Sequence, residues 1–120
     1  MGCPVLGSRA LFAGGGQGGL TTGGAFTTVD VYDEALTRTA GTPLSTKRFF
    51  PAGATVGGHA LFAGGTPKDG SLVVDAYDAS LTLTAAANLS SARNSYAAAA
   101  VGGYALFAGD KAYADVYDAS

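Results

Sequence analysis

The side chains of this chain that could perform acid–base chemistry are mainly carboxylates, because nine acidic residues stand beside a single histidine. Six of the nine acids form three repeated pairs along the sequence: Asp30 and Asp33, Asp75 and Asp78, Asp115 and Asp118. A position that recurs in every repeat is typical of architecture, whereas a catalytic acid needs one special environment. We therefore expect the second acid of each pair to accept hydrogen bonds in a turn, and the first to pair with Arg48 or Arg93.

The other reactive residues do not form a catalytic or metal-binding set. His59 is the only histidine and Cys3 the only cysteine, so a metal site, a disulfide and a Ser/His/Asp or Cys/His arrangement all lack partners. The segment Gly14 to Gly19 matches G-x-G-x-x-G, but the residues after it do not predict the helix that a phosphate site requires. The sequence predicts no catalytic residue, no metal and no cofactor.

Composition and charge argue against two classes of partner. The chain has 120 residues, a net charge of -2 and few, scattered basic residues, which does not resemble a nucleic-acid-binding surface. The apolar run Tyr96 to Gly109 is too short to cross a bilayer, and we find neither a signal peptide nor a transmembrane segment. We expect no nucleic-acid and no membrane partner, and the cellular compartment is not encoded.

Two sequence blocks recur three times and divide the chain into similar units. Ala10-Leu11-Phe12-Ala13 returns at Ala60 and at Ala105, and Val29-Asp30-Val31-Tyr32-Asp33 returns in related form at Val74 and at Ala114. The distance from the last Asp of one unit to the first Ala of the next is 27 residues in both cases, whereas the gap between the two blocks varies. A constant distance indicates ordered structure, and a variable gap indicates a surface loop.

The units predict short strands and tight turns. Their segments are rich in Val, Tyr, Phe, Leu and Thr and are separated by Gly, Asn, Pro and Asp, without helical periodicity. We expect strands at Tyr96 to Val101 and Tyr104 to Ala108, joined by Gly102-Gly103, a further strand ending at Tyr117, and one near Leu81 to Ala87. The repeated Phe and Tyr residues are predicted to pack between sheets: Phe12, Phe62, Phe107, Tyr32, Tyr77 and Tyr117.

These motifs resemble those of the Kelch family. Its repeats carry an Arg before an inner strand, a hydrophobic strand that ends in Gly-Gly, and then an acidic-x-Tyr-Asp strand. The matching residues are Arg48 and Arg93, Gly14-Gly15 and Gly64-Gly65, and the Asp and Tyr of each second block. Two features depart from the family pattern: Thr39 and Thr84 stand where many Kelch repeats have Trp, and the third doublet is Gly109-Asp110.

The resemblance implies an all-β, Kelch-type β-propeller with blades of four antiparallel strands. About three blades are expected, forming an incomplete ring: blade 1 at about 1–44, blade 2 at about 45–89, and blade 3, without its last strand, at about 90–120. Because closed propellers have four to eight blades, we expect other blades to be partners of this chain. They come either from a longer chain, of which this is a fragment, or from homo-oligomerisation.

If the four strands of a blade are lettered a to d in chain order, their alternating direction places the b-to-c and d-to-a loops on one face of such a propeller. Kelch propellers commonly bind protein segments there. The resemblance therefore implies a non-catalytic scaffold for a protein or peptide ligand. The expected ligand-binding residues lie in these loops: Lys47, Arg48, Phe49, Lys68, Arg93, Asn94 and Tyr96. Alternatively, Arg48 and Arg93 pair with the strand Asp residues and are then not available to a ligand. A carbohydrate-binding or cell-surface module is the alternative function, and a fragment of a propeller enzyme ranks behind both.

Overall fold

The computed structural model of the chain describes residues 4–14, 26–48, 51–65, 72–90, 97–108 and 114–118. In these ranges the protein is all β, with three antiparallel sheets and no helix. The described residues accordingly contain no helix of the length and hydrophobicity needed to cross a membrane. The prediction of an all-β fold is confirmed.

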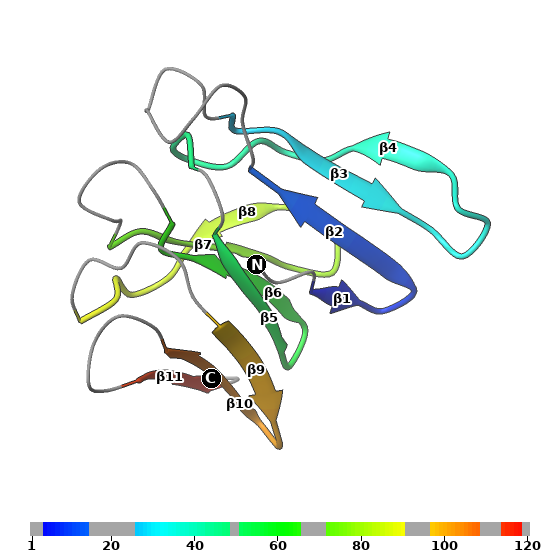
Figure 1. Cartoon of the computed structure of the whole chain (residues 1–120). Helices are drawn as coiled ribbons and strands as arrows, with labels where there is room; N and C mark the ends of the chain where they lie inside the picture. Colours follow the sequence, from blue (N-terminus) through cyan, green and yellow to red (C-terminus); the bar gives the residue numbers. More distant parts are fainter. Residues whose placement is uncertain are drawn as a thin grey trace.

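Each sheet is formed by strands that are consecutive in the sequence (Figure 1). The first sheet contains β1 (Val5–Leu6), β2 (Arg9–Ala13), β3 (Val29–Tyr32) and β4 (Arg38–Ala40). The second contains β5 (Ala52–Val56), β6 (His59–Ala63), β7 (Val74–Tyr77) and β8 (Leu83–Ala85). The third contains β9 (Ala97–Val101), β10 (Tyr104–Ala108) and β11 (Asp115–Asp118).

The repeated sequence blocks occupy equivalent places in the three sheets. Phe12 pairs with Asp30 across β2 and β3, and the same register joins Phe62 to Asp75 and Phe107 to Asp115. The hairpins that join the first two strands of each sheet turn at Gly7, Gly57 and Gly102, whose φ angles of 62°, 55° and 57° favour glycine. The repeated blocks therefore give the same strand pairing in all three sheets.

The predicted strand boundaries hold in part. β10 spans Tyr104–Ala108 as predicted, but β11 ends at Asp118 and not at Tyr117. β8 is shorter than the predicted segment Leu81 to Ala87, because Leu81 has a φ of 65° and belongs to the turn before the strand. Tyr96, the predicted start of β9, lies outside the described residues.

The turn role predicted for the second acid of each pair is confirmed for two of the three. Asp33 Oδ1 accepts hydrogen bonds from the backbone N–H groups of Ala35 and Thr37, both at 2.9 Å. Asp78 Oδ1 accepts from Ser80 N and Thr82 N, both at 3.0 Å. Asp118 is the last residue of β11, and the residues after it lie outside the described ranges, so its turn role stays a prediction.

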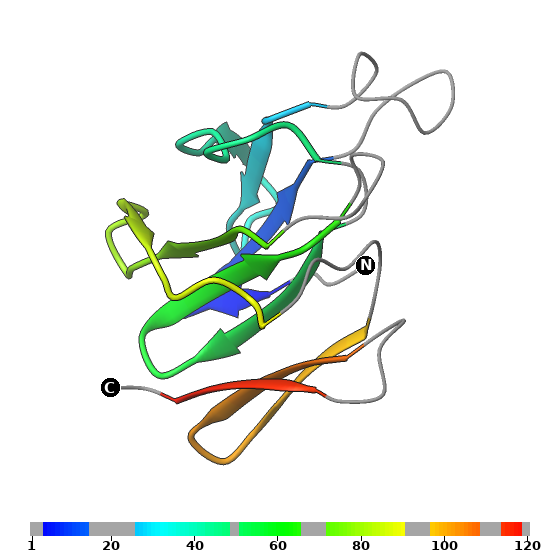
Figure 2. The same cartoon turned by 90° about the vertical axis from the view of Figure 1, so that its left-hand side faces the viewer.

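The second sheet lies between the other two (Figures 1 and 2). One apolar cluster fills the space between the first and second sheets and includes Leu11, Val31 and Phe62. The other lies between the second and third sheets and includes Leu61 and Phe107. Burying both faces of the middle sheet against its neighbours supplies the main stabilisation of the stack.

The aromatic residues of the repeats form one Phe–Tyr pair in each sheet, with ring planes nearly perpendicular. Phe62 and Phe107 are buried between sheets, as predicted. Phe12 is 48% exposed, so the prediction that it packs between sheets is wrong. The physical reason is its position: Phe12 lies on the outer face of the first sheet, which no described residue covers.

Candidate functional site

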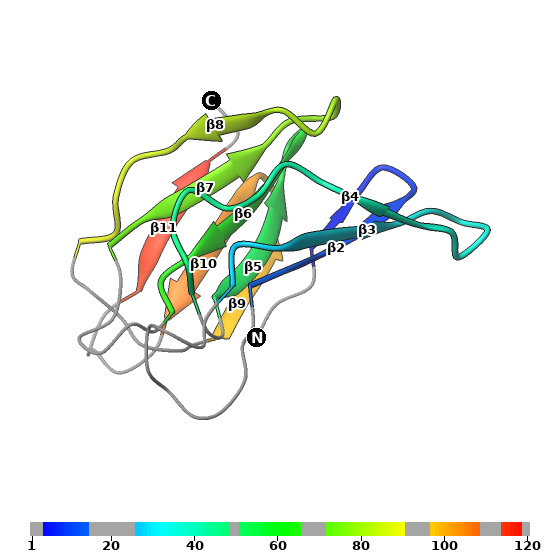
Figure 3. The same cartoon turned by 90° about the horizontal axis from the view of Figure 1, so that it is seen from above.

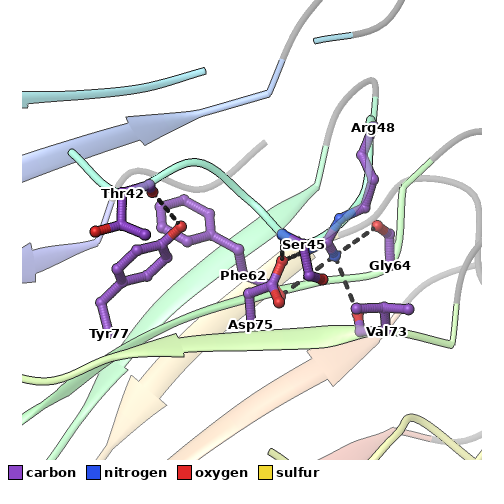
Figure 4. A network of polar contacts seen from close by, with 8 residues as sticks. All are labelled: Thr42, Ser45, Arg48, Phe62, Gly64, Val73, Asp75 and Tyr77. Atoms are coloured by element: carbon purple, nitrogen blue, oxygen red, sulfur yellow. Dashed lines mark hydrogen bonds and ion pairs between the residues drawn. The ribbon is translucent and has the colours of Figure 1, made fainter. Parts of the chain in front are cut away.

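The most extensive polar network of the described residues surrounds Arg48, in the segment between β4 and β5 (Figure 4). Its backbone forms an isolated antiparallel bridge with Phe26, and its side chain is fully buried in the second sheet. The guanidinium donates from Nη1 to the carbonyl oxygens of Gly64 at 3.1 Å and of Val73 at 3.0 Å. A longer bond of 3.4 Å reaches the carbonyl oxygen of Phe62. Arg48 therefore ties the end of β6 to the start of β7.

Asp75 on β7 supplies the negative charge of this network. Arg48 Nη2 forms a direct ion pair with Asp75 Oδ2, and both side chains are buried. The same carboxylate oxygen accepts a hydrogen bond of 3.1 Å from Ser45 N. Burial lowers the pKa of Arg48, while the charge of Asp75 acts in the opposite direction and favours the protonated guanidinium. The predicted pairing of a strand Asp with Arg48 is confirmed.

Gly14 shows how closely the first sheet approaches this site. A Cβ atom on Gly14 would stand 2.6 Å from the backbone carbonyl oxygen of Arg48, and Gly14 also has a φ of 78°. Only glycine satisfies both conditions without a shift of the backbone. The first Gly of the first Gly-Gly doublet is therefore required for packing of the first sheet on the segment that carries Arg48.

Tyr77 closes the other end of the network. Its hydroxyl donates to the carbonyl oxygen of Thr42 at 2.7 Å, and its ring lies against Phe62. Burial raises the pKa of Tyr77, and the charge of Asp75 raises it further. The sequence did not predict this bond, nor the bond from Ser45 N.

The strand Asp residues of the other two sheets have different surroundings. Asp30 pairs with Arg38 at 2.9 Å within the first sheet, on its exposed side. Asp115 accepts from Ser90 N at 3.3 Å, which is equivalent to the bond between Ser45 and Asp75. A signal for this bond existed in the sequence, since Leu44-Ser45 recurs as Leu89-Ser90 at the repeat spacing and both Leu residues are buried.

The structure describes two of the seven residues expected to bind a ligand. Lys47 is exposed, and its neighbour Arg48 is buried in the ion pair with Asp75. A ligand that reached the Arg48 side chain would have to displace that ion pair. The other five lie outside the described residues: Phe49, Lys68, Arg93, Asn94 and Tyr96.

A groove of about 710 Å³ runs between the second and third sheets. Its walls include His59 from β6, Tyr104 from β10, and Asp115 and Asp118 from β11. Among the described residues no group of three His, Cys, Asp or Glu side chains could hold a metal ion. The groove arises from the packing of two sheets, so the sequence pattern carried no signal for it.

Comparison with known proteins supports the fold alone. Neither a protein-family model nor a curated protein sequence matches this chain. The chain is similar to the solved structure named "Structure of YjhT", with a TM-score of 0.74 and 11% sequence identity. The match covers 98% of this chain and 44% of that chain, so this chain spans less than half the length of that protein.

Proposed function

We propose that the three sheets are blades of a Kelch-type β-propeller and that the chain acts as a non-catalytic scaffold for a protein or peptide ligand. The blade assignment is supported by the equivalent pairing of Phe and Asp in all three sheets and by the stacking of consecutive sheets. The buried pair of Arg48 and Asp75 supports it further, because the Kelch resemblance rests on the same Arg and Asp positions.

One observation supports the location of the ligand. The connections of variable length leave the sheets from one edge, because β2, β6 and β10 all end on the same side of the molecule (Figure 3). They comprise residues 14–28, 64–73 and 109–114. Segments that change length between repeats do not contribute equally to the shared architecture, so they are free to recognise a partner.

The carboxylates of the described sheets support a scaffold over an enzyme. Asp33 and Asp78 accept backbone hydrogen bonds in turns, and Asp30 and Asp75 are paired with arginines. Acids engaged in this way stabilise the architecture and have no free role in proton transfer. Lys47 is the exposed cation beside the Arg48 network, and we assign it to ligand contact together with the five loop residues named above.

Binding to a peptide library and to a glycan array tests this function. We expect peptide ligands, and we expect the variant Lys47→Glu to bind them about 3- to 10-fold more weakly, because one surface charge contributes about 1 kcal/mol. Arg9→Glu is the matched control: Arg9 is also exposed but begins β2, next to the hairpin at the opposite edge. Binding to glycans alone, or equal losses in both variants, would contradict the proposal.

A further inference from the structure

Each of the two interfaces between neighbouring sheets joins two different kinds of sheet face. Strand residues alternate between the two faces of a sheet. On the second sheet, Phe62, Asp75 and Tyr77 lie on one face, which we call the aromatic face. Leu61 and Ala76 lie on the other, which we call the aliphatic face.

The same pairing of faces occurs twice. The aromatic face of the second sheet packs on Leu11, Val29 and Val31, which form the aliphatic face of the first sheet. The aromatic face of the third sheet, with Phe107 and Tyr117, packs on the aliphatic face of the second. Each aromatic face also donates one hydrogen bond of 2.7 Å to the preceding unit: Tyr77 to the Thr42 carbonyl and Tyr117 to the Ala87 carbonyl.

The two outer faces of the stack are the two halves of this same interface. The first sheet exposes its aromatic face, where Phe12 is 48% exposed and forms a perpendicular pair with Tyr32 at 5.8 Å. The Phe107–Tyr117 pair, which is packed against a neighbouring sheet, has the same centroid distance of 5.8 Å. The third sheet exposes its aliphatic face, where Val101 is 63% and Val116 is 57% exposed. Exposed apolar faces of this kind mark association surfaces.

We propose that a second copy of this chain covers both outer faces, with the aromatic face of each copy packed on the aliphatic face of the other. A second copy then covers both outer faces, and the new contacts are of the same type as those that already join the sheets within each copy. Different patches that meet head to tail close into a ring when the rotation permits. Two copies supply six sheets, which is within the range of four to eight blades that closed propellers contain. The closure rests on the propeller proposed above, whereas the pairing of faces rests on the described contacts.

Solution mass and two charged variants test the closed dimer. We expect a mass of twice 11.8 kDa by light scattering for the unmodified chain. Phe12→Arg blocks the aromatic face and Val116→Glu blocks the aliphatic face, so each variant alone is expected at 11.8 kDa. Both positions are exposed in the single chain, and an unchanged circular dichroism spectrum shows that each variant still folds. Leu36→Arg, in an exposed turn outside both faces, is the control that stays dimeric.

Mixing the two blocked variants gives the sharper readout. In a mixed dimer one interface is unmodified, and the other places the introduced cation opposite the introduced anion. We therefore expect the mixture to recover the dimer mass. A monomeric unmodified chain, a mass that keeps rising with concentration, or a mixture that stays monomeric would overturn the proposal. Peptide binding by a monomer would leave the proposed function intact, so the two proposals fail separately.

Discussion

Asp30 and Asp75 occupy equivalent positions of the first and second sheets, yet their ion pairs have opposite environments. Arg48 and Asp75 are buried, with side-chain exposures of 0% and 4%. Arg38 and Asp30 are exposed, with side-chain exposures of 60% and 32%. The strand sequence is nearly the same in both, Val-Asp-Val-Tyr and Val-Asp-Ala-Tyr. The neighbouring sheet, and not the local sequence, decides whether the repeated Asp becomes part of the core.

The buried pair and the exposed pair contribute differently to the free energy of unfolding. Removing two charges from water is costly, and the second sheet offsets this cost with three carbonyl acceptors for Arg48 and a backbone donor for Asp75. The exposed pair of the first sheet keeps its hydration and is screened by salt, so it contributes little. One repeated residue can thus be essential in one sheet and dispensable in the next.

Removal of the buried carboxylate is expected to have the largest effect. Asp75→Ala leaves the Arg48 guanidinium buried without its counter-charge, so we expect a loss of about 3–5 kcal/mol in the free energy of unfolding. Asp30→Ala is the matched control, and both variants are measured in the Val116→Glu background, where the first sheet stays uncovered; there we expect Asp30→Ala to lose less than about 1 kcal/mol. Urea denaturation of both variants measures the difference. Equal losses would show that the environment of the pair is unimportant.

Alkaline pH is expected to weaken the second sheet by a smaller, graded amount. The pKa of Tyr77 is raised in the folded state, so the folded protein retains a proton that the unfolded chain loses near pH 10. The stability that this shift supplies is complete below about pH 10 and falls by about 1.4 kcal/mol per pH unit above it.

Urea denaturation at several pH values measures this slope. Tyr77→Phe is expected to reduce the slope, because it removes the hydroxyl whose pKa is raised. The prediction would fail if Tyr77→Phe retained the slope of the unmodified chain.

Removal of the exposed arginine is expected to have the smallest effect. In the same Val116→Glu background, Arg38→Ala should cost less than about 1 kcal/mol, and the cost should shrink further in 1 M salt because the pair is screened. The loss caused by Asp75→Ala should change little with salt, since the buried pair excludes ions. Urea denaturation at two salt concentrations checks both statements, and a large salt-independent effect of Arg38→Ala would contradict them.

The sequence repeats were sufficient to predict the all-β class, the position of β10, the turn acids Asp33 and Asp78, and the pairing of a strand Asp with Arg48. These features depend on spacing and on local chemistry, which a repeat displays directly. The Kelch identity of the fold and the ligand edge stay proposals, because they rest on the order of motifs and on loops outside the described residues.

The sequence could not predict which copy of a repeated residue is buried. Phe12 and Phe62 have the same local sequence, but one faces outward and the other faces the first sheet. The groove beside His59 and the bond from Tyr77 to Thr42 likewise arise between sheets. Such features depend on which sheet packs against each face, and a repeated motif carries no information about the sheet beside it.

The covering of the second sheet on both faces also determines the order in which the protein opens. In a single chain, each sheet at an end of the stack packs on one neighbour only, so it opens at lower free energy than the sheet between them. Amide protons of β6, which lies inside that sheet, are therefore expected to exchange with solvent only after an outer sheet has separated. Local opening therefore starts at the ends and reaches the Arg48 network last.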